Sequence, residues 1–431
     1  MKLVADLQIH SKYSRAVSPQ MVLENLDKWA KIKGINVLGT GDLTHPLWLK
    51  EIKQKLEPAE PGLFKLKKEY KVESIGRLEN NSEPRFMLTG EISCIYSKGG
   101  KVRRVHHLYL VPDIATADKI NAKLSFIGNL KSDGRPILGL DSKKFLEICL
   151  EVSPDVMVIP AHAWTPWFSI FGSKSGFDTI EECFDELSPH IHAIETGLSS
   201  DPAMNWRLSQ LDRVAIVSNS DSHSPTRIGR EANVFDTELS YAGIIEAIKS
   251  KDPKKFLYTV EFFPEEGKYH YDGHRACGVS FNPEETKKHN SICPKCKRPL
   301  TVGVLYRVAE LADRPVGFRP VNPVPYKSAI PLDQIIADSI GLAGTGNTGW
   351  PKKVLQEYEN LIKGFGNEFN VLLDEPPDDL KAKTRPEIAE GVLRVREGRA
   401  HIEPGYDGEY GKISIFTASE REDASKQATL L

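Results

Sequence analysis

The first 262 residues alternate short apolar runs with longer amphipathic stretches. One stretch spans residues 18–34, with Ser18 as its predicted N-cap and Gly34 at its end. The apolar runs lie at 35–42, 86–93, 107–112, 156–162, 192–196 and 214–223. Because parallel strands need long crossovers between them, the alternation predicts an α/β fold with parallel strands in an open sheet or a barrel.

The pattern changes after residue 262 and predicts three further regions. Residues 263–315 are rich in Cys, His and Gly, which favours a small metal-binding domain. Residues 316–416 are mostly helical, and the Pro- and Gly-rich segment 314–331 is typical of a linker. Residues 417–431 are polar until the last positions and predict a disordered tail.

The composition is that of a globular protein in water, with 40% hydrophobic and 27% charged residues. The sequence has no run of about 18 apolar residues and no charged-then-apolar N-terminus, so we expect neither a membrane span nor a signal peptide. Six cysteines in 431 residues are typical of a reducing cytoplasm. A net charge of −2 neither demands nor excludes a nucleic-acid partner.

Polar residues cluster where the predicted strands end. They are Asp6, Gln8, His10, Asp42, His45, Glu91, His106, His107, His162, Glu195, Asp221 and His223. Strand ends line the active site in α/β folds, so these side chains are expected to converge. His with Asp and Glu, and without Cys, is the ligand set of a hydrolytic centre that holds divalent metals.

The order of these residues resembles the PHP (polymerase and histidinol phosphatase) superfamily over residues 1–262. The resemblance implies a distorted α/β barrel with two or three divalent ions (Zn, Mn, Mg or Fe). It places one metal on His10, Glu91 and Asp221, a second on Glu91, His107 and His162, and a third on His223 and His45. It favours His107 over His106, because His107 directly precedes Leu108. Asp221, Glu91 and His223 are the expected catalytic residues.

Two positions depart from the PHP pattern. Gln8 stands where the family has its first histidine, so Gln8 is either a weak ligand or a hydrogen-bonding neighbour of the metals. The family's Asp-His dipeptide is opened here to "DLTH", so Asp42 and His45 do not both correspond to it.

A zinc-ligand spacing stands in the region 263–315. His274-x2-Cys277 is followed after fifteen residues by Cys293-x2-Cys296. With one Cys replaced by His, this is the spacing of a structural zinc site. His270 and His289 are the reserve candidates for the histidine ligand.

"GTGNTGWPKK" (344–353) matches G-x-G-x-x-G but follows a helical pattern, so a dinucleotide fold is rejected. A glycine-rich turn before Lys352 and Lys353 could still bind phosphate at a helix start, and a flexible helix connection explains it equally well.

The barrel, the Cys/His region and the helical region together resemble the endonuclease Q family of DNA-repair nucleases. The segments "YDGHRACGVS", "ELADRP" and "PGYDGEYG" carry this resemblance. It implies nicking of DNA on the 5′ side of deaminated bases (hypoxanthine, uracil, xanthine) and abasic sites. The implied partners are double- and single-stranded DNA with deaminated bases.

Further residues are candidates for DNA contacts. Aromatic residues follow His162 and either stack on an extruded base or pack between the domains: Trp164, Trp167, Phe168 and Phe171. Arg227 and Arg230 follow His223 and are candidates for clamping phosphate. Gln427, Leu430 and Leu431 resemble a sliding-clamp-binding peptide, although a featureless tail explains them nearly as well.

Three functions remain open at this level. The leading one is a metal-dependent DNA endonuclease with no protein nucleophile, in which the metals bind the scissile phosphate and supply hydroxide. The second is a PHP-type phosphatase that acts on a small phosphate monoester. The third is a non-catalytic DNA-binding scaffold, which the loss of a histidine at Gln8 favours.

Overall fold

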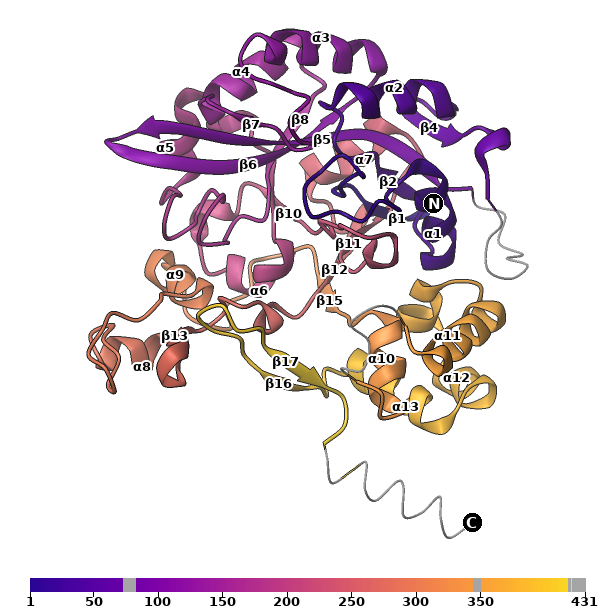
Figure 1. Ribbon diagram of the computed structural model, residues 1–431, viewed down its shortest axis with the longest axis vertical. Coiled ribbons are helices and arrows are strands. Elements are labelled where there is room, and N and C mark those ends of the chain that lie inside the picture. The colour runs from indigo at the N-terminus through magenta and orange to yellow at the C-terminus, as the bar shows by residue number, and fades with distance from the viewer. Residues whose placement is uncertain (73–82, 344–349, 418–419, 421–431) are drawn as a thin grey trace.

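The computed structural model describes residues 1–72, 83–343, 350–417 and 420, and it shows three lobes (Figure 1). The barrel domain (residues 1–262) lies at the top of the view. The Cys/His region (263–315) lies below it on one side, and the helical region (332–396) lies below it on the other. The predicted α/β domain, small Cys/His region and helical C-terminal region are therefore confirmed.

The barrel domain is built on a mixed sheet. Its strands are β1 (Lys2–Asp6), β2 (Val37–Gly39), β3 (Leu56–Pro58), β4 (Leu63–Leu66), β5 (Arg85–Lys98), β6 (Lys101–Val111), β7 (Ile137–Leu138), β8 (Met157–Pro160), β11 (Ala232–Asp236) and β12 (Phe256–Glu261), with β9 (Ala193–Glu195) and β10 (Ala215–Val217) as a separate parallel pair. The order along the sheet is β12-β11-β1-β2-β5-β4-β3, and β6 joins β5 to β8. Each predicted apolar run overlaps one of these strands.

The prediction of parallel strands is only partly correct. β1, β2 and β5 are parallel, whereas β11 pairs antiparallel with both β1 and β12, and β6 pairs antiparallel with both β5 and β8. The long β5–β6 hairpin turns at Gly99 and Gly100, which have φ of 62° and 73°. Glycine adopts positive φ at no steric cost, so two glycines close a two-residue hairpin.

Helices cover the outside of this sheet. They are α1 (Leu23–Lys33), α2 (Pro46–Lys55), α3 (Ile114–Ser125), α4 (Ser142–Val152), α5 (Ile180–Phe184), α6 (Pro202–Asn205) and α7 (Tyr241–Ser250). α1 ends as predicted at Gly34, whose φ is 88° and whose N–H bonds to Ala30 O. It begins at Leu23 rather than after Ser18, so the predicted N-cap is wrong.

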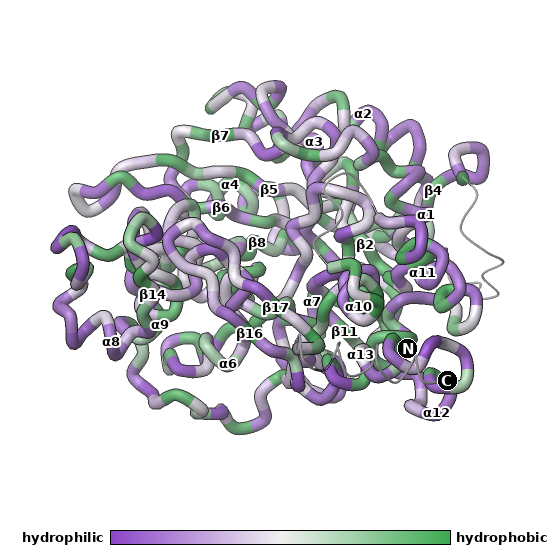
Figure 2. Tube along the Cα trace, turned by 60° about the horizontal axis from the view of Figure 1, so that its bottom comes forward, coloured by the Kyte–Doolittle hydropathy of each residue, from purple (hydrophilic) through white to green (hydrophobic). Residues whose placement is uncertain are grey.

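The Cys/His region is small and mostly irregular. Its elements are the 3₁₀ turns η6 (Pro264–Glu266) and η7 (Arg275–Cys277), strands β13 (Asp272–His274) and β14 (Val279–Phe281), and helices α8 (Pro283–Lys288) and α9 (Val304–Leu311). Its hydrophobic cluster is built around Val279, Cys293 and Leu300. Figure 2 shows α8 as hydrophilic, in agreement with its exposed Glu and Lys side chains. So little apolar surface cannot hold a fold alone, which is why such regions usually need metal or disulfides.

The helical region has its own core. It contains α10 (Leu332–Ser339), α11 (Lys352–Phe365), the π-helical turn η8 (Asn370–Asp374), α12 (Pro377–Lys383) and α13 (Pro386–Arg396). Ile335, Ile336, Tyr358, Leu361 and Ile362 are fully buried between these helices. None of the helices in the described ranges has the length and apolar character needed for a membrane span.

Two segments tie the three lobes together. The predicted linker 314–331 is not only a linker, because β15 (Tyr326–Ser328) within it pairs parallel with β12 and extends the barrel sheet. Strands β16 (His401–Glu403) and β17 (Lys412–Ser414) form an arm that reaches from the helical region back to the Cys/His region (Figure 1). There Gly405 N donates to Glu265 O at 2.8 Å, and Tyr271 N donates to Gly405 O at 2.9 Å.

Candidate metal centre and its cavity

A cavity of about 720 Å³ opens where the three lobes meet. The barrel domain contributes His106, His162, Asp221 and His223 to its wall. The Cys/His region, α10 and the β16–β17 arm contribute Lys268, Tyr269, Gln334 and Tyr410. These four predicted strand-end residues therefore meet at the mouth of the barrel, beneath a rim that the other two lobes supply.

The first potential metal-binding group is Glu91, His106 and His162, whose ligand atoms lie within 4.8 Å of one another. Glu91 Oε1 lies 2.8 Å from His106 Nδ1 and 3.5 Å from His162 Nε2. β5 and β6 are antiparallel neighbours, which places Glu91 and His106 on adjoining strands. β8 pairs with β6 and ends just before His162.

The second group is His10, Asp221 and His223. His10 Nε2 lies 3.0 Å from Asp221 Oδ1 and 3.2 Å from Glu91 Oε2, so His10 links the two groups. His223 Nδ1 lies 2.8 Å from Asp221 O. Because a carbonyl oxygen only accepts, this Nδ1 carries the proton and leaves Nε2 free to bind a metal.

Two side chains of the first group have charge states that suit metal binding. Burial raises the pKa of Glu91, but Arg135, His10, His106 and His162 outweigh it and hold that pKa well below its usual range. Burial, with Arg135 nearby, lowers the pKa of His106 to about 4. Glu91 is therefore an anion and His106 a neutral imidazole at pH 7, which are the forms that bind divalent metals.

Buried carboxyl groups hold these ligands in place. Asp42 Oδ1 lies 2.9 Å from His10 Nδ1, and Asp42 Oδ2 accepts from Ser11 N at 2.6 Å. Glu195 accepts from His162 N at 2.8 Å, and burial raises the pKa of Glu195 to about 8. Carboxylates behind the ligands fix their orientation, as in metal sites generally.

Several predicted ligands lie outside both groups, and each has another partner. Asp6 accepts from Ser220 N and Gly229 N at 3.0 and 2.8 Å, so it supports the loop that carries Asp221. Gln8 Nε2 donates to Glu91 Oε2 at 2.9 Å, as expected of a hydrogen-bonding neighbour, and its buried Oε1 has no hydrogen-bond partner among the described residues.

The preference for His107 over His106 is wrong. Successive side chains of β6 point to opposite faces, and His106 is the one that faces Glu91. His107 Nε2 lies 2.8 Å from Ser142 Oγ, and its ring packs between Phe145 and Phe184.

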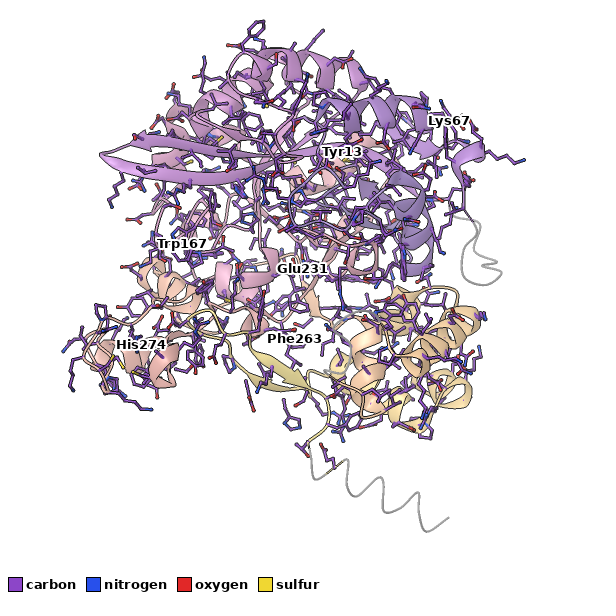
Figure 3. All side chains as sticks on the ribbon, in the orientation of Figure 1. Tyr13, Lys67, Trp167, Glu231, Phe263 and His274 are labelled. Carbon is purple, nitrogen blue, oxygen red and sulfur yellow. The ribbon has the colours of Figure 1, made fainter. Side chains whose placement is uncertain are left out.

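The placement of His45 at a third metal is also wrong. His45 is buried and stacks on Tyr13 with ring centroids 4.4 Å apart (Tyr13 is labelled in Figure 3). Asp42 likewise acts behind the site, because its carboxylate is engaged by His10 and the Ser11–Ser14 turn.

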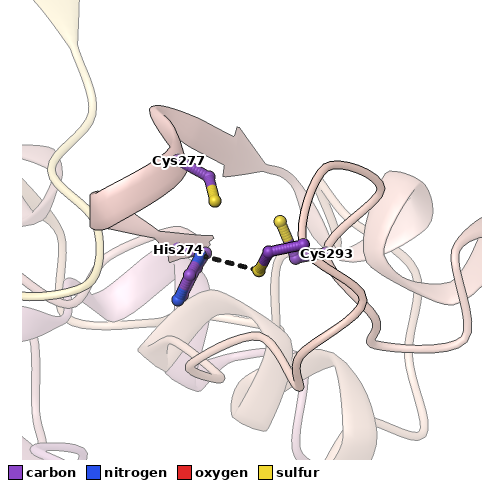
Figure 4. A group of neighbouring side chains, drawn as sticks. His274, Cys277 and Cys293 are labelled. Carbon is purple, nitrogen blue, oxygen red and sulfur yellow. Dashed lines mark hydrogen bonds between the residues drawn. The ribbon is translucent and has the colours of Figure 1, made fainter.

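The four predicted zinc ligands meet as expected. The ligand atoms of His274, Cys277, Cys293 and Cys296 lie within 4.8 Å of one another, and His274 Nδ1 is 3.4 Å from Cys296 Sγ (Figure 4). Although burial raises the pKa of the Cys293 thiol, backbone N–H groups of Cys296 and Lys295 lower it to about 6. Four such donors fit a tetrahedral zinc.

The reserve histidines are not in this group. His289 stacks on Phe281 with centroids 4.8 Å apart, and His270 stacks on Tyr271 at 5.5 Å. The choice of His274 therefore agrees with the geometry.

The four predicted DNA-stacking aromatics divide into two pairs. Trp164 and Phe171 are fully buried against each other, and Trp164 Nε1 donates to Asn205 Oδ1 at 2.8 Å. The stacking prediction is wrong for this pair, which packs in the barrel core. Trp167, which is labelled in Figure 3, is 38% exposed. It lines the cavity together with Phe168, so both rings remain available.

The cationic candidates are also placed unequally. Arg227 and Arg230 line the cavity as predicted. Lys352 and Lys353 begin α11 with exposed side chains, and the glycine-rich segment 344–349 before them lies outside the described residues. Arg135 lines the cavity beside Glu91 but stands in "SDGRPILG", where no motif or strand end marked it.

Sequence relatives cover this chain unequally. The MJ0043 C-terminal domain family matches residues 331–399. The uncharacterized protein MJ0043 of Methanocaldococcus jannaschii is 36% identical over 261 residues, which are 59% of this chain and 31% of that protein. The uncharacterized protein YqxK of Bacillus subtilis is 29% identical over 427 residues, which are 96% of this chain and 99% of that protein.

Solved structures match along the whole chain. The lesion-specific endonuclease PfuEndoQ from Pyrococcus furiosus has a TM-score of 0.82 and 30% identity over 99% of both chains. Endonuclease Q in complex with a 27-mer duplex that has an abasic lesion at the active site has a TM-score of 0.82 and 31% identity over 98% of both chains. Because this likeness in sequence and structure covers the barrel, the Cys/His region and the helical region together, the chain belongs to the endonuclease Q family of lesion-specific endonucleases.

Proposed function

We propose that this chain is a metal-dependent DNA-repair endonuclease that nicks duplex DNA on the 5′ side of a damaged nucleotide. The proposed lesions are the deaminated bases hypoxanthine, uracil and xanthine, and abasic sites. The observation that carries the proposal is the pair of His/carboxylate groups at one cavity, beneath a rim of aromatic and cationic side chains. The full-length likeness to endonuclease Q structures supports it over the phosphatase and scaffold alternatives.

The metals would be held by Glu91, His106 and His162 and by His10, Asp221 and His223. When bound, two or three divalent ions (Zn, Mn, Mg or Fe) activate water and neutralise charge on the scissile phosphate. Asp42 keeps the proton of His10 on Nδ1, and Glu195 holds the backbone of His162, so the protein orients the ligands before DNA arrives.

Lesion selection would begin before the cavity is reached. A mispaired deaminated base costs less to unpair and unstack than a normal base, so it is extruded more readily. Trp167 and Phe168 line the cavity beside His106 and offer aromatic faces on which an extruded base can stack. The 5′ phosphate of that nucleotide would then lie at the two His/carboxylate groups.

A labelled-duplex assay tests the proposal. We expect a single nick 5′ to inosine in a 5′-labelled duplex, with no cutting of its undamaged twin and little hydrolysis of a phosphate monoester. Asp221→Ala should lower the rate at least about a hundredfold, since one lost electrostatic contact at a reaction centre typically costs that much. DNA affinity should largely remain, because it rests on distributed phosphate contacts.

The matched control is His190→Ala. His190 is an exposed histidine at the end of η2 (Asp185–His190), and in the sequence it comes shortly before β9 begins. This variant should cut at the wild-type rate. Equal cutting of both duplexes by the wild type would contradict lesion recognition. An Asp221→Ala rate above a tenth of the wild-type rate would contradict the metal assignment.

The proposal also includes one structural zinc ion and one protein partner. One structural zinc would be bound by His274, Cys277, Cys293 and Cys296. Gln427, Leu430 and Leu431 lie outside the described residues, and we keep them as a proposed sliding-clamp peptide. Deleting residues 425–431 should weaken pull-down of the clamp without changing intrinsic cleavage, and equal pull-down by both chains would remove this part of the proposal.

A further inference from the structure

Within the described residues, the side chains of Arg135, Arg227, Arg230 and Lys268 bring positive charge to the cavity wall. Arg227 Nη1 is paired with Asp333 Oδ1 of α10 at 3.2 Å. Arg230 Nε donates to Ser220 O at 2.9 Å. These two predicted phosphate clamps therefore already have protein partners.

Lys268 is also engaged, but by aromatic rings. Its Nζ lies 5.8 Å from the ring centroid of Tyr269 and 5.6 Å from that of Tyr410. It belongs to the rim, on the side of the Cys/His region. A cation at the rim can attract DNA, but it is not part of the His/carboxylate groups.

Arg135 differs from these three because it lies between the two His/carboxylate groups. Its Nη1 is 3.3 Å from Glu91 Oε1, 3.4 Å from Glu91 Oε2 and 3.4 Å from His10 Nε2. These contacts are longer than the 2.7–2.9 Å of a tight charge-assisted bond. Nη2 and Nε have no hydrogen-bond partner in the described part of the chain, and the side chain is 28% exposed.

The backbone around Arg135 is held firmly. Gly134 N donates to Tyr13 O at 3.1 Å, and Gly134 O accepts from Thr44 Oγ1 at 3.2 Å. On the other side, Ser93 N donates to Pro136 O at 3.0 Å. A Cβ on residue 134 would come within 2.2 Å of Asp42 Oδ2, so only glycine fits there. The fold thus fixes the loop and aims the guanidinium at the site.

We propose that Arg135 is a catalytic residue that binds the two non-bridging oxygens of the scissile phosphate through Nη2 and Nε. A guanidinium presents two parallel N–H donors that match two phosphate oxygens, and it stays charged at any working pH. No covalent bond of Arg135 changes in the reaction. Water adds to phosphorus, the P–O3′ bond breaks, and the 3′ oxygen takes the proton. The inference rests on the proposed endonuclease function.

The first test compares Arg135→Ala, Arg135→Lys and the control Arg15→Ala on the inosine duplex. Arg15 is 80% exposed and contacts Asp133 of the same loop, so its removal perturbs the loop without reaching the cavity. We expect Arg135→Ala to lower kcat by about a hundredfold to a thousandfold, with a far smaller change in KM. Arg135→Lys should recover only part of the lost kcat, because an ammonium lacks the two parallel N–H donors of a guanidinium. Added guanidinium should partly restore Arg135→Ala, whereas methylammonium should not.

A second measurement does not depend on cleavage. Inorganic phosphate binding to the metal-loaded proteins should weaken at least tenfold in Arg135→Ala and stay unchanged in Arg15→Ala, with equal metal content in both. Equal phosphate binding in wild type and Arg135→Ala, or loss of metal from Arg135→Ala, would overturn the inference. If the wild type binds phosphate through Arg135 but does not cut the inosine duplex, the proposed function fails and the role of Arg135 in phosphate binding stands.

Discussion

Replacing Asp42 by Asn tests how the protein prepares His10. Asp42 is fully buried, and its two oxygens have separate tasks. Oδ2 accepts from Ser11 N, Ser11 Oγ and Ser14 Oγ at 2.6, 2.6 and 2.9 Å, while Oδ1 faces His10 Nδ1 at 2.9 Å. Asn also tolerates the left-handed φ of 49° at this position, so the backbone can stay as it is.

The substitution Asp42→Asn should invert the tautomer of His10. The introduced amide would keep its oxygen toward the three donors, since an amide nitrogen cannot accept from them. Its NH₂ would then face His10 Nδ1 and donate to it, which moves the imidazole proton to Nε2. Nε2 is the atom that lies 3.0 Å from Asp221 and 3.2 Å from Glu91, so its lone pair would be lost to a metal.

The expected magnitude follows from what the variant loses. Removing a carboxylate behind a metal-bound histidine typically costs about 10–100-fold in metal affinity or activity, or about 1.4–2.8 kcal/mol. Asp42→Asn should cost close to the upper end of this range. It moves the proton of His10 to Nε2, whereas the loss of a carboxylate alone would only leave the proton free to occupy either nitrogen. Metal content, the cleavage rate and the ¹⁵N shifts of His10 measure the three consequences.

Asp113→Asn is the matched control, because Asp113 caps α3 through Thr116 N and Asn caps a helix equally well. It should leave all three quantities unchanged. Wild-type metal content and cleavage in Asp42→Asn, with His10 still protonated on Nδ1, would refute the reasoning.

Further predictions concern the rest of the fold. Cys293→Ser should release one tightly held zinc and destabilise residues 263–315, because metal binding there is coupled to folding. Zinc analysis and proteolysis measure this, and an unchanged zinc content would exclude Cys293 as a ligand. Burial raises the pKa of Glu261 to about 8, so the folded state binds its proton more tightly and stability falls as pH rises from about 4.5 to 8. Glu261→Gln should flatten that fall in a series of unfolding curves, and an unchanged slope would contradict it. Trp164→Ala should cost about 3–5 kcal/mol of unfolding free energy. Trp167→Ala should keep the melting temperature but weaken lesion-DNA binding by about 1–3 kcal/mol. If Trp167→Ala instead lowers stability and Trp164→Ala weakens DNA binding, the assignment of Trp164 to the core and Trp167 to DNA is wrong.

The sequence alone determined the class of fold and the chemistry of the site. Local alternation of apolar runs and amphipathic stretches reflects the burial of each element on one side, so it predicted strands such as β8 and the end of α1 at Gly34. The spacing of His274, Cys277, Cys293 and Cys296 predicted a group of four ligands, because two ligands with two residues between them lie on one turn. The order of the three regions, with the segments "YDGHRACGVS", "ELADRP" and "PGYDGEYG", predicted the endonuclease Q family.

Only the tertiary structure decided which neighbours face the site. His106 and His107 are adjacent in the chain. Which of them faces the site depends on the register of β6 against β5, and long-range pairing sets that register. Trp164 and Trp167 likewise share one loop, yet one is fully buried and the other lines the cavity. Arg135 carries no local signal at all, because its position comes from the contacts of Gly134 and Pro136 with distant segments of the chain. A sequence records which chemical groups a site can use, whereas their positions follow from packing between segments far apart in the chain.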